Sequence, residues 1–271
     1  MSGHRTVRSA DGTAIAHESA GDGPALILVG GAFSFRRYKS WVQLFELLAP
    51  RFRVVSYDRR GRGDSGDARE YAVEREIDDL AALVQAAGGA AHVFGMSSGG
   101  VLALRAAAAG VPIERAVVYQ PPFGVDASGH LPPHDFGPRL RALAASGNRG
   151  ATASYFMREG MGAPRVFVGL LRIARPIWKN LAAVAHTLPY DYAVMSDTVH
   201  GKPLANEPWA SIVTPTLVVD GGKSPASLRR AADALAGHMP NAERRTLDGQ
   251  SHNLSMKLMA PVLEEFLLAR R

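Results

Sequence analysis

Ser97 lies in the pentapeptide Gly95-Met96-Ser97-Ser98-Gly99, between an apolar run and an Ala/Leu-rich segment with helical periodicity. A serine with a glycine two residues away on either side is typical of a nucleophile on a sharp strand-to-helix turn. Side chains at Gly95 and Gly99 would collide with the neighbouring strand and helix, so the glycines allow the turn to hold Ser97 in a strained conformation. Ser98 lacks this arrangement, because Met96 and Gly100 stand at the equivalent offsets. The pattern predicts that Ser97 is a catalytic nucleophile.

A histidine near the carboxyl-terminal end of the chain is placed to activate this serine. A serine hydroxyl is a weak nucleophile at neutral pH and needs a base within hydrogen-bond reach. Of the nine histidines, His252 lies in the loop just after the last predicted strand, in Gly249-Gln250-Ser251-His252. Ligands bind at the carboxyl edge of open α/β sheets, and Ser97 is expected at that same edge. We therefore expect His252 to be the general base.

Acyl transfer also requires hydrogen-bond donors aimed at the oxyanion that develops on the substrate. The segment Gly30-Gly31-Ala32-Phe33 follows a predicted buried strand, and its two glycines let the backbone turn close to Ser97. We expect the backbone N–H groups of Ala32 and Ser98 to be the two donors.

Strand patterns alternate with helical patterns along the chain, which is typical of a parallel sheet with helices on its faces. The predicted strands cover residues 5–8, 13–17, 25–29, 53–57, 91–94, 116–120, 215–220 and 242–247. The predicted helices cover residues 41–48, 72–87, 101–109, 225–236 and 261–269. Asp11-Gly12 marks a hairpin turn between the first two strands. The predicted fold class is therefore α/β, with a mostly parallel, doubly wound central sheet.

Strand patterns are missing from residues 126–206, where short helical pieces contain Pro, Met and aromatic residues. We interpret residues 126–206 as a helical cap inserted into a core formed by residues 1–125 and 207–271. A cap with apolar and aromatic lining above Ser97 suits a pocket for a small molecule. The candidate substrate-binding side chains are Phe33, Met96, Tyr155 and Trp178.

Four segments of the chain resemble the α/β-hydrolase family and follow its order, with the nucleophile before the histidine. They are Gly30-Gly31-Ala32, Asp58-Arg59-Arg60-Gly61-Arg62-Gly63-Asp64-Ser65, Gly95-Met96-Ser97-Ser98-Gly99 and Gly249-Gln250-Ser251-His252. The resemblance covers nearly the whole chain except the cap. It implies the α/β-hydrolase fold, an esterase- or lactonase-like acyl-enzyme mechanism, and neither a metal nor an organic cofactor. The family's oxyanion loop usually begins His-Gly, whereas Gly30 occupies the histidine position here.

The acid that orients the histidine in this family has no clear counterpart in this sequence. Most members carry it after the penultimate strand, where this chain has Gly221-Gly222-Lys223-Ser224-Pro225 without a carboxylate. Other members carry it at the end of the strand that follows the nucleophile helix, and that position here is Gln120. We expect Asp126, the nearest carboxylate, to be the acid. The alternatives are Asp220 and a Ser–His pair supported by the neutral Gln120.

Charge and short motifs argue against several other functions. The formal net charge is +6, but no basic stripe is interleaved with aromatic residues, so we expect no nucleic-acid partner. The stretch Gly61–Gly66 fits the dinucleotide pattern G-x-G-x-x-G, yet it stands apart from both the preceding strand and the next helix. Prolines between His130 and His134 make a poor metal site. We interpret the basic residues of two loops as solvated: Arg36, Arg37, Lys39, Arg59, Arg60 and Arg62.

The remaining composition favours an ordinary globular protein. The absence of cysteine excludes disulfides and a cysteine nucleophile. No apolar run approaches the roughly 18–20 residues that span a bilayer, and Met1–Thr6 lacks the apolar region of a secretory signal. We expect a cytoplasmic enzyme without a membrane partner, and the sequence leaves its oligomeric state open.

These patterns predict hydrolysis of an ester or lactone of a small, largely apolar molecule, through an acyl-enzyme on Ser97 with His252 as general base. The same fold also supports cofactor-free lyases and cyclases of biosynthetic pathways, and such an enzyme is the alternative. A catalytically inactive small-molecule binding protein is the second alternative. The presence of Ser97, its two glycines and His252 argues against it.

Overall fold

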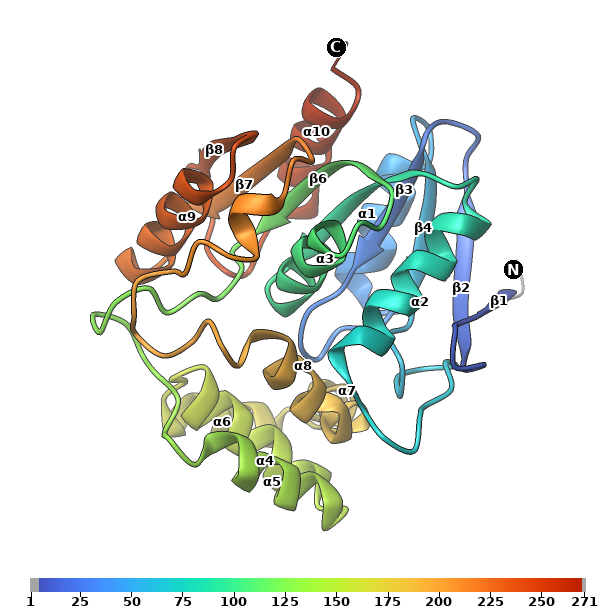
Figure 1. The fold of residues 1–271 in the computed structure, drawn as a ribbon. Helices are drawn as coiled ribbons and strands as arrows, with labels where there is room; N and C mark the ends of the chain where they lie inside the picture. The colour runs from blue at the N-terminus through green and yellow to red at the C-terminus, as the bar shows by residue number, and fades with distance from the viewer. Residues whose placement is uncertain (1–4, 270–271) are drawn as a thin grey trace.

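The computed structural model describes residues 5–269, which form an eight-stranded sheet with helices around it (Figure 1). Residues 1–4, where the segment tested for a secretory signal begins, lie outside this range. The sheet order is β1-β2-β4-β3-β5-β6-β7-β8. The first two strands pair antiparallel and β2 runs antiparallel to β4, while all other neighbours are parallel. The strands are β1 (Arg5–Arg8), β2 (Ala14–Ala20), β3 (Ala25–Val29), β4 (Arg53–Tyr57), β5 (Ala91–Met96), β6 (Ile113–Tyr119), β7 (Thr216–Gly221) and β8 (Ala242–Leu247).

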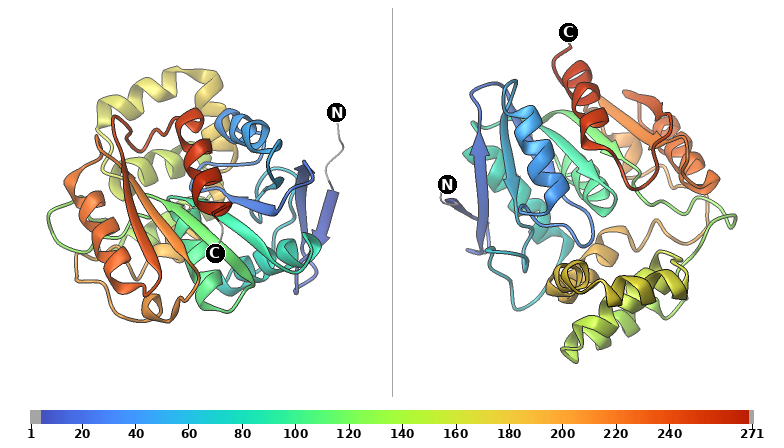
Figure 2. Two further views of the ribbon diagram at one scale, coloured as in Figure 1. Left: turned by 90° about the horizontal axis from the view of Figure 1, so that it is seen from above. Right: turned by 180° about the vertical axis from the view of Figure 1, so that it is seen from behind.

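Helices cover both faces of the sheet because successive strand residues point to opposite sides. On one face, Leu26 and Leu28 of β3 pack with α1 (Lys39–Leu48) and α10 (Met256–Leu267), which lie side by side (Figure 2). On the other face, Ile27 and Val29 belong to the core with three further helices. These are α2 (Val73–Ala86), α3 (Ser98–Ala108) and α9 (Ala226–His238). The predicted doubly wound α/β class is confirmed.

The predicted last helix differs most from the structure. It was expected to begin at Pro261, but α10 begins at Met256 and contains Pro261 in its interior. Proline has no N–H to donate to the carbonyl of Lys257, four residues earlier, and this loss disfavours the helix. The helix continues nevertheless, because a buried apolar stripe that includes Met259 and Leu263 runs past the proline on both sides.

Five helices lie together at one end of the molecule, between β6 and β7 in the chain (Figure 1). The last of them, α8, packs against α3 and α4. The five are α4 (Phe136–Ala145), α5 (Arg149–Tyr155), α6 (Arg165–Ile173), α7 (Arg175–Ala183) and α8 (Leu188–Met195), with short helical turns at Phe156–Gly160, Ala185–Thr187 and Trp209–Ser211.

Among the residues that the structure describes, no helix has the length and apolarity needed to cross a membrane.

Candidate active site

The carboxyl ends of three adjacent strands carry the strained backbone of this molecule. Within residues 5–269, the non-glycine residues with positive φ are Phe33 at 63°, Ser97 at 55° and Gln120 at 46°. They follow β3, β5 and β6, which neighbour one another in the sheet. Positive φ is sterically unfavourable for residues with a side chain, and such strain concentrates at functional sites. The centre of this edge is therefore the candidate active site.

Ser97 occupies the turn between β5 and α3. Its φ and ψ are 55° and −128°, and its backbone N–H donates to the Tyr119 carbonyl at 2.9 Å. A Cβ added to Gly95 would lie 2.6 Å from the carbonyl oxygen of Gly99, and one added to Gly99 would lie 2.3 Å from that of Val29. Real Cβ atoms do not approach backbone so closely, so the steric reason given for the two glycines is confirmed.

His252 lies on the loop between β8 and α10, and its ring is hydrogen-bonded to the end of β6. The distance from His252 Nδ1 to Gln120 Oε1 is 2.8 Å. Because an amide oxygen only accepts hydrogen bonds, this contact places the ring proton on Nδ1 and leaves a lone pair on Nε2. Burial lowers the pKa of His252 below its ordinary value of 6.5. The ring is therefore neutral at pH 7, as a general base must be.

The residues at the end of β6 hold this loop at two points. Gln120 is fully buried, and its Nε2 donates to Ser224 Oγ. The Tyr119 hydroxyl donates to the carbonyl of Ser251 at 2.6 Å, directly before His252. The histidine is thus fixed by both its side chain and its neighbouring backbone.

Neither carboxylate considered as the acid is bonded to His252. The Asp126 side chain is 40% exposed and accepts from the Ser128 N–H at 2.9 Å and from Arg230 Nε at 2.7 Å. Asp220 is buried, and its oxygens lie 2.9 and 3.1 Å from the guanidinium of Arg244. The expectation that Asp126 orients His252 is therefore wrong, because Gln120 holds Nδ1. The same contact removes Asp220 from that role.

The predicted oxyanion loop lies against Ser97. A Cβ added to Gly31 would lie 2.7 Å from the Met96 carbonyl oxygen and 3.0 Å from Ser97 Cβ. Ala32 therefore follows a glycine that contacts the turn of Ser97. Ser98, the first residue of α3, also lies near this glycine, with its Oγ 3.5 Å from the same added Cβ. The geometry is compatible with both amides serving as oxyanion donors.

The arginines of the loops after β3 and β4 were expected in solvent, but four of the five are buried. Their carboxylate partners lie 17 to 132 residues away in the sequence. These ion pairs could therefore not be predicted from the sequence alone. Arg37 is the exception, with a side chain that is 65% exposed. The interpretation as solvated residues is wrong for the four that are at most 2% exposed: Arg36, Arg59, Arg60 and Arg62.

The candidate substrate-binding residues fall into two groups. Phe33 meets the ring of Phe156 edge-on at 5.7 Å, so the predicted oxyanion loop contacts an aromatic cluster formed by Phe136, Tyr155, Phe156 and Tyr192. Tyr155 belongs to this cluster, and its buried hydroxyl has no hydrogen-bond partner among the described residues. Trp178 packs beside an arginine, 5.8 Å from its guanidinium carbon, while Met96 packs toward the face with α1 and α10. Phe33 and Tyr155 are therefore the stronger candidates.

Two other motifs have structural roles. Within residues 5–269, no group of three or more His, Cys, Asp or Glu side chains could hold a metal ion, and His130 Nε2 is bonded to the carbonyl of Glu159. The glycine-rich loop closes on itself, because Gly61 N–H donates to the Gly66 carbonyl at 2.9 Å. Its Ser65 hydroxyl donates to the Asp58 carbonyl at 2.6 Å.

Comparisons with known proteins agree with this architecture. The family model described as "Alpha/beta hydrolase family" matches residues 26–264. An alpha/beta hydrolase from Sphaerobacter thermophilus is 53% identical, covers 97% of this chain and 100% of that chain, and superposes with a TM-score of 0.90. A thermophilic esterase from Thermogutta terrifontis is 21% identical over 98% of both chains, with a TM-score of 0.75. At that identity it shows the fold alone.

A curated relative matches only a short stretch. The protein described as "Probable oxidoreductase EphD" from Mycobacterium tuberculosis is 39% identical over 85 residues, which is 30% of this chain and 14% of that protein. The family rests instead on the match that spans nearly the whole chain. This chain belongs to the alpha/beta hydrolase family.

Proposed function

We propose that this protein is a serine hydrolase that cleaves an ester or lactone bond in a small, largely apolar molecule. The observation that carries the proposal is the hydrogen bond between His252 Nδ1 and Gln120 Oε1, at the strand end where the N–H of Ser97, itself held at positive φ, donates to the Tyr119 carbonyl. The bond gives the imidazole the tautomer that a general base requires. In this proposal, helices α4–α8 serve as a cap over the site, spanning about residues 126–206.

In the proposed mechanism, Ser97 Oγ attacks the substrate carbonyl while His252 Nε2 takes the serine proton. The N–H groups of Ala32 and Ser98 receive the developing oxyanion. His252 then returns the proton to the leaving alkoxide, and an acyl group remains on Ser97. In the second half, His252 takes a proton from water as the water oxygen attacks the acyl carbon. His252 then gives this proton to Ser97 Oγ as the acyl–serine bond breaks, which releases the carboxylic acid and restores both side chains.

The neutral Gln120 sets a limit on this chemistry. It orients His252 but adds no negative charge to stabilise the imidazolium, and impairing the acid of a serine triad costs about 10⁴-fold in kcat. Esters and lactones expel a less basic leaving group than amides do, so they require less help from the histidine. The proposal therefore assigns ester-type substrates, and the aromatic cluster that contacts Phe33 favours apolar ones.

Steady-state hydrolysis of aryl esters and lactones of increasing acyl length, by the wild type and Ser97→Ala, tests the proposal. We expect saturable turnover by the wild type and at least 10³-fold less by Ser97→Ala. An equal rate for the two proteins would refute the role of Ser97.

A cofactor-free lyase or cyclase is the second candidate, and the same glutamine favours it. A histidine without a charged partner can move a proton within a bound substrate even where it supports acyl transfer weakly. Turnover without an acyl-enzyme, abolished by His252→Ala but kept by Ser97→Ala, would point to this chemistry. Ligand binding without turnover by either protein would instead point to a binding protein.

A further inference from the structure

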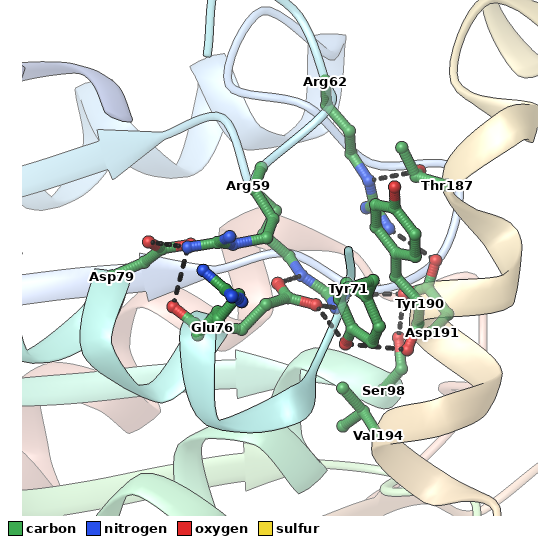
Figure 3. A network of polar contacts seen from close by, with 12 residues as sticks. Arg59, Arg62, Tyr71, Glu76, Asp79, Ser98, Thr187, Tyr190, Asp191 and Val194 are labelled. Carbon is green, nitrogen blue, oxygen red and sulfur yellow. Dashed lines mark hydrogen bonds and ion pairs between the residues drawn. The ribbon is translucent and has the colours of Figure 1, made fainter. Parts of the chain in front are cut away.

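Four buried charged side chains join α8 to the loop after β4 and to α2 (Figure 3). We call Arg59, Arg62, Glu76 and Asp191 the buried quartet. Each is at most 2% exposed. Arg59 lies 2.6 Å from both Glu76 and Asp191, and Arg62 lies 2.5 Å from the other oxygen of Asp191. Two positive and two negative charges therefore balance away from solvent.

The quartet also contacts the backbone and side chains that flank Ser97. The Ser98 hydroxyl donates to Asp191 Oδ1 at 2.7 Å, a contact visible at the lower right of the network in Figure 3. Arg62 Nη1 donates to the carbonyl of Gly31 at 2.7 Å and to that of Ser34 at 3.0 Å. Asp191 thus reaches one side of the nucleophile turn directly and the other side through Arg62.

The contact at Gly31 acts on the predicted donor at Ala32. The carbonyl of Gly31 and the N–H of Ala32 belong to one planar peptide unit, in which the two bonds point in opposite directions. A guanidinium that fixes this carbonyl therefore fixes the direction of the N–H. A charged donor on the carbonyl also polarises the unit, which makes the N–H a stronger donor.

Stability alone gives a poor reason for this arrangement. Burying ion pairs often contributes little net stability, because the desolvation of the charges offsets their attraction. The pKa of each guanidinium reflects this balance between burial and the attraction of nearby carboxylates. Burial lowers the pKa of Arg62 and Asp191 only partly offsets it, whereas Glu76 and Asp191 outweigh burial and raise the pKa of Arg59. Arginine guanidinium groups are not deprotonated in proteins at neutral pH, so both side chains keep their charge.

We propose that Arg62 and Asp191 are positioning residues for the oxyanion hole, so that α8 of the helical cap sets the geometry of the catalytic amides. This inference rests on the proposed hydrolase function. It also accounts for the glycine at position 30, where the family usually has a histidine. Guanidinium contacts to the carbonyls of Gly30, at 3.3 Å, and Gly31 brace a loop that lacks that side chain.

The test compares Arg62→Lys with Arg60→Lys. Arg60 is a matched control, because it is 1% exposed and hydrogen-bonded to Asp79 at 2.6 Å. Within residues 5–269 its side chain bonds to Asp79, Asp11 and the Arg75 carbonyl, and not to Ser98 or the Gly30–Gly31 carbonyls. In both variants a lysine keeps the charge and loses the forked geometry. The readouts are kcat and KM for an aryl ester per active site titrated with a fluorophosphonate, together with Tm.

We expect Arg62→Lys to lower kcat at least 10-fold with KM within 3-fold of the wild type, because only the transition state uses the oxyanion donors. Arg60→Lys should lower Tm while kcat per titrated site stays within 2-fold. Ser98→Ala, which leaves the quartet's charges intact, should lower kcat about 3- to 10-fold and serves if Arg62→Lys does not fold.

Equal kcat for the wild type, Arg62→Lys and Ser98→Ala would overturn the inference and leave the hydrolase function standing. If the wild type neither hydrolyses esters nor reacts with the fluorophosphonate, the proposed function fails and the inference falls with it. Equal losses of kcat in Arg62→Lys and Arg60→Lys would also overturn it, since they would indicate a general effect of disturbing buried ion pairs.

Discussion

Replacing Gln120 with glutamate should turn the Ser–His pair into a charged triad. The glutamine is fully buried and 2.8 Å from His252 Nδ1, so Gln120→Glu places a carboxylate at the same point with nearly the same shape. Ser224, which now accepts a hydrogen bond from the glutamine Nε2, has a hydroxyl that can rotate and donate to the second carboxylate oxygen.

The size of the effect follows from the geometry. Unit charges about 4 Å apart interact by about 4 kcal/mol at an effective dielectric constant of about 20, and about 1.4 kcal/mol corresponds to one pKa unit. The upper bound is therefore about 3 units of increase in the His252 pKa. Burial of the new carboxylate opposes its ionisation, which reduces the increase in the His252 pKa. We expect a rise of about 1–2 units and, above pH 8, a kcat/KM about 10- to 100-fold higher.

The assay is a pH profile of kcat/KM between pH 5 and 9.5 for the wild type, Gln120→Glu and Gln120→Ala. In the wild type, burial lowers the pKa of His252, so activity should fall only below pH 6.5. In Gln120→Glu this acid limb should move to higher pH, and in Gln120→Ala the rate should fall because nothing fixes the tautomer. An acid limb at the same pH in Gln120→Glu and the wild type, with equal rates, would refute the role assigned to Gln120.

Three further outcomes follow from the structure. Asp126→Asn and Asp220→Asn should each keep kcat within about 3-fold, since neither carboxylate is bonded to His252; a 100-fold loss in either would show that the acid has been misassigned. Gly99→Ala should lower the free energy of unfolding by about 1–3 kcal/mol or more in denaturant unfolding, because its Cβ would lie 2.3 Å from the Val29 carbonyl oxygen. The control is Gly169→Ala in α6, which has open space around it and should be neutral or stabilising. Acidification below pH 6.5 should lower Tm. The pKa values of four histidines are lower in the folded protein than in the unfolded chain, so below pH 6.5 the unfolded chain binds more protons and the stability present above pH 6.5 is lost. These histidines are His17, His92, His186 and His252.

The sequence predicted the parts of the site that depend on local pattern. Glycines flanking Ser97 and an alternation of strands and helices are visible along the chain, and they led to the correct sheet and to the correct turn. His252 could be chosen from nine histidines because it follows the last strand. The doubly wound sheet then brings the ends of β3, β5 and β6 side by side.

The missed features depend on contacts between distant segments. Gln120 was only an alternative to a carboxylate, because its contact with His252 joins residues 132 positions apart and its positive φ is not visible in the sequence. The nearest carboxylate, Asp126, was preferred for its charge, yet it pairs with an arginine at the surface. The side-chain partners of Arg62, Thr187 and Asp191, likewise lie more than 120 residues away, so hydrophilic loop composition wrongly indicated solvent.

The most direct test concerns Ser97 as an activated nucleophile. Intact mass after incubation with a fluorophosphonate, for the wild type and Ser97→Ala, tests it most directly. We expect one adduct on the wild type, located on Ser97 by peptide mapping, and none on Ser97→Ala. Folded wild type without an adduct, or an adduct that persists in Ser97→Ala, would contradict the account.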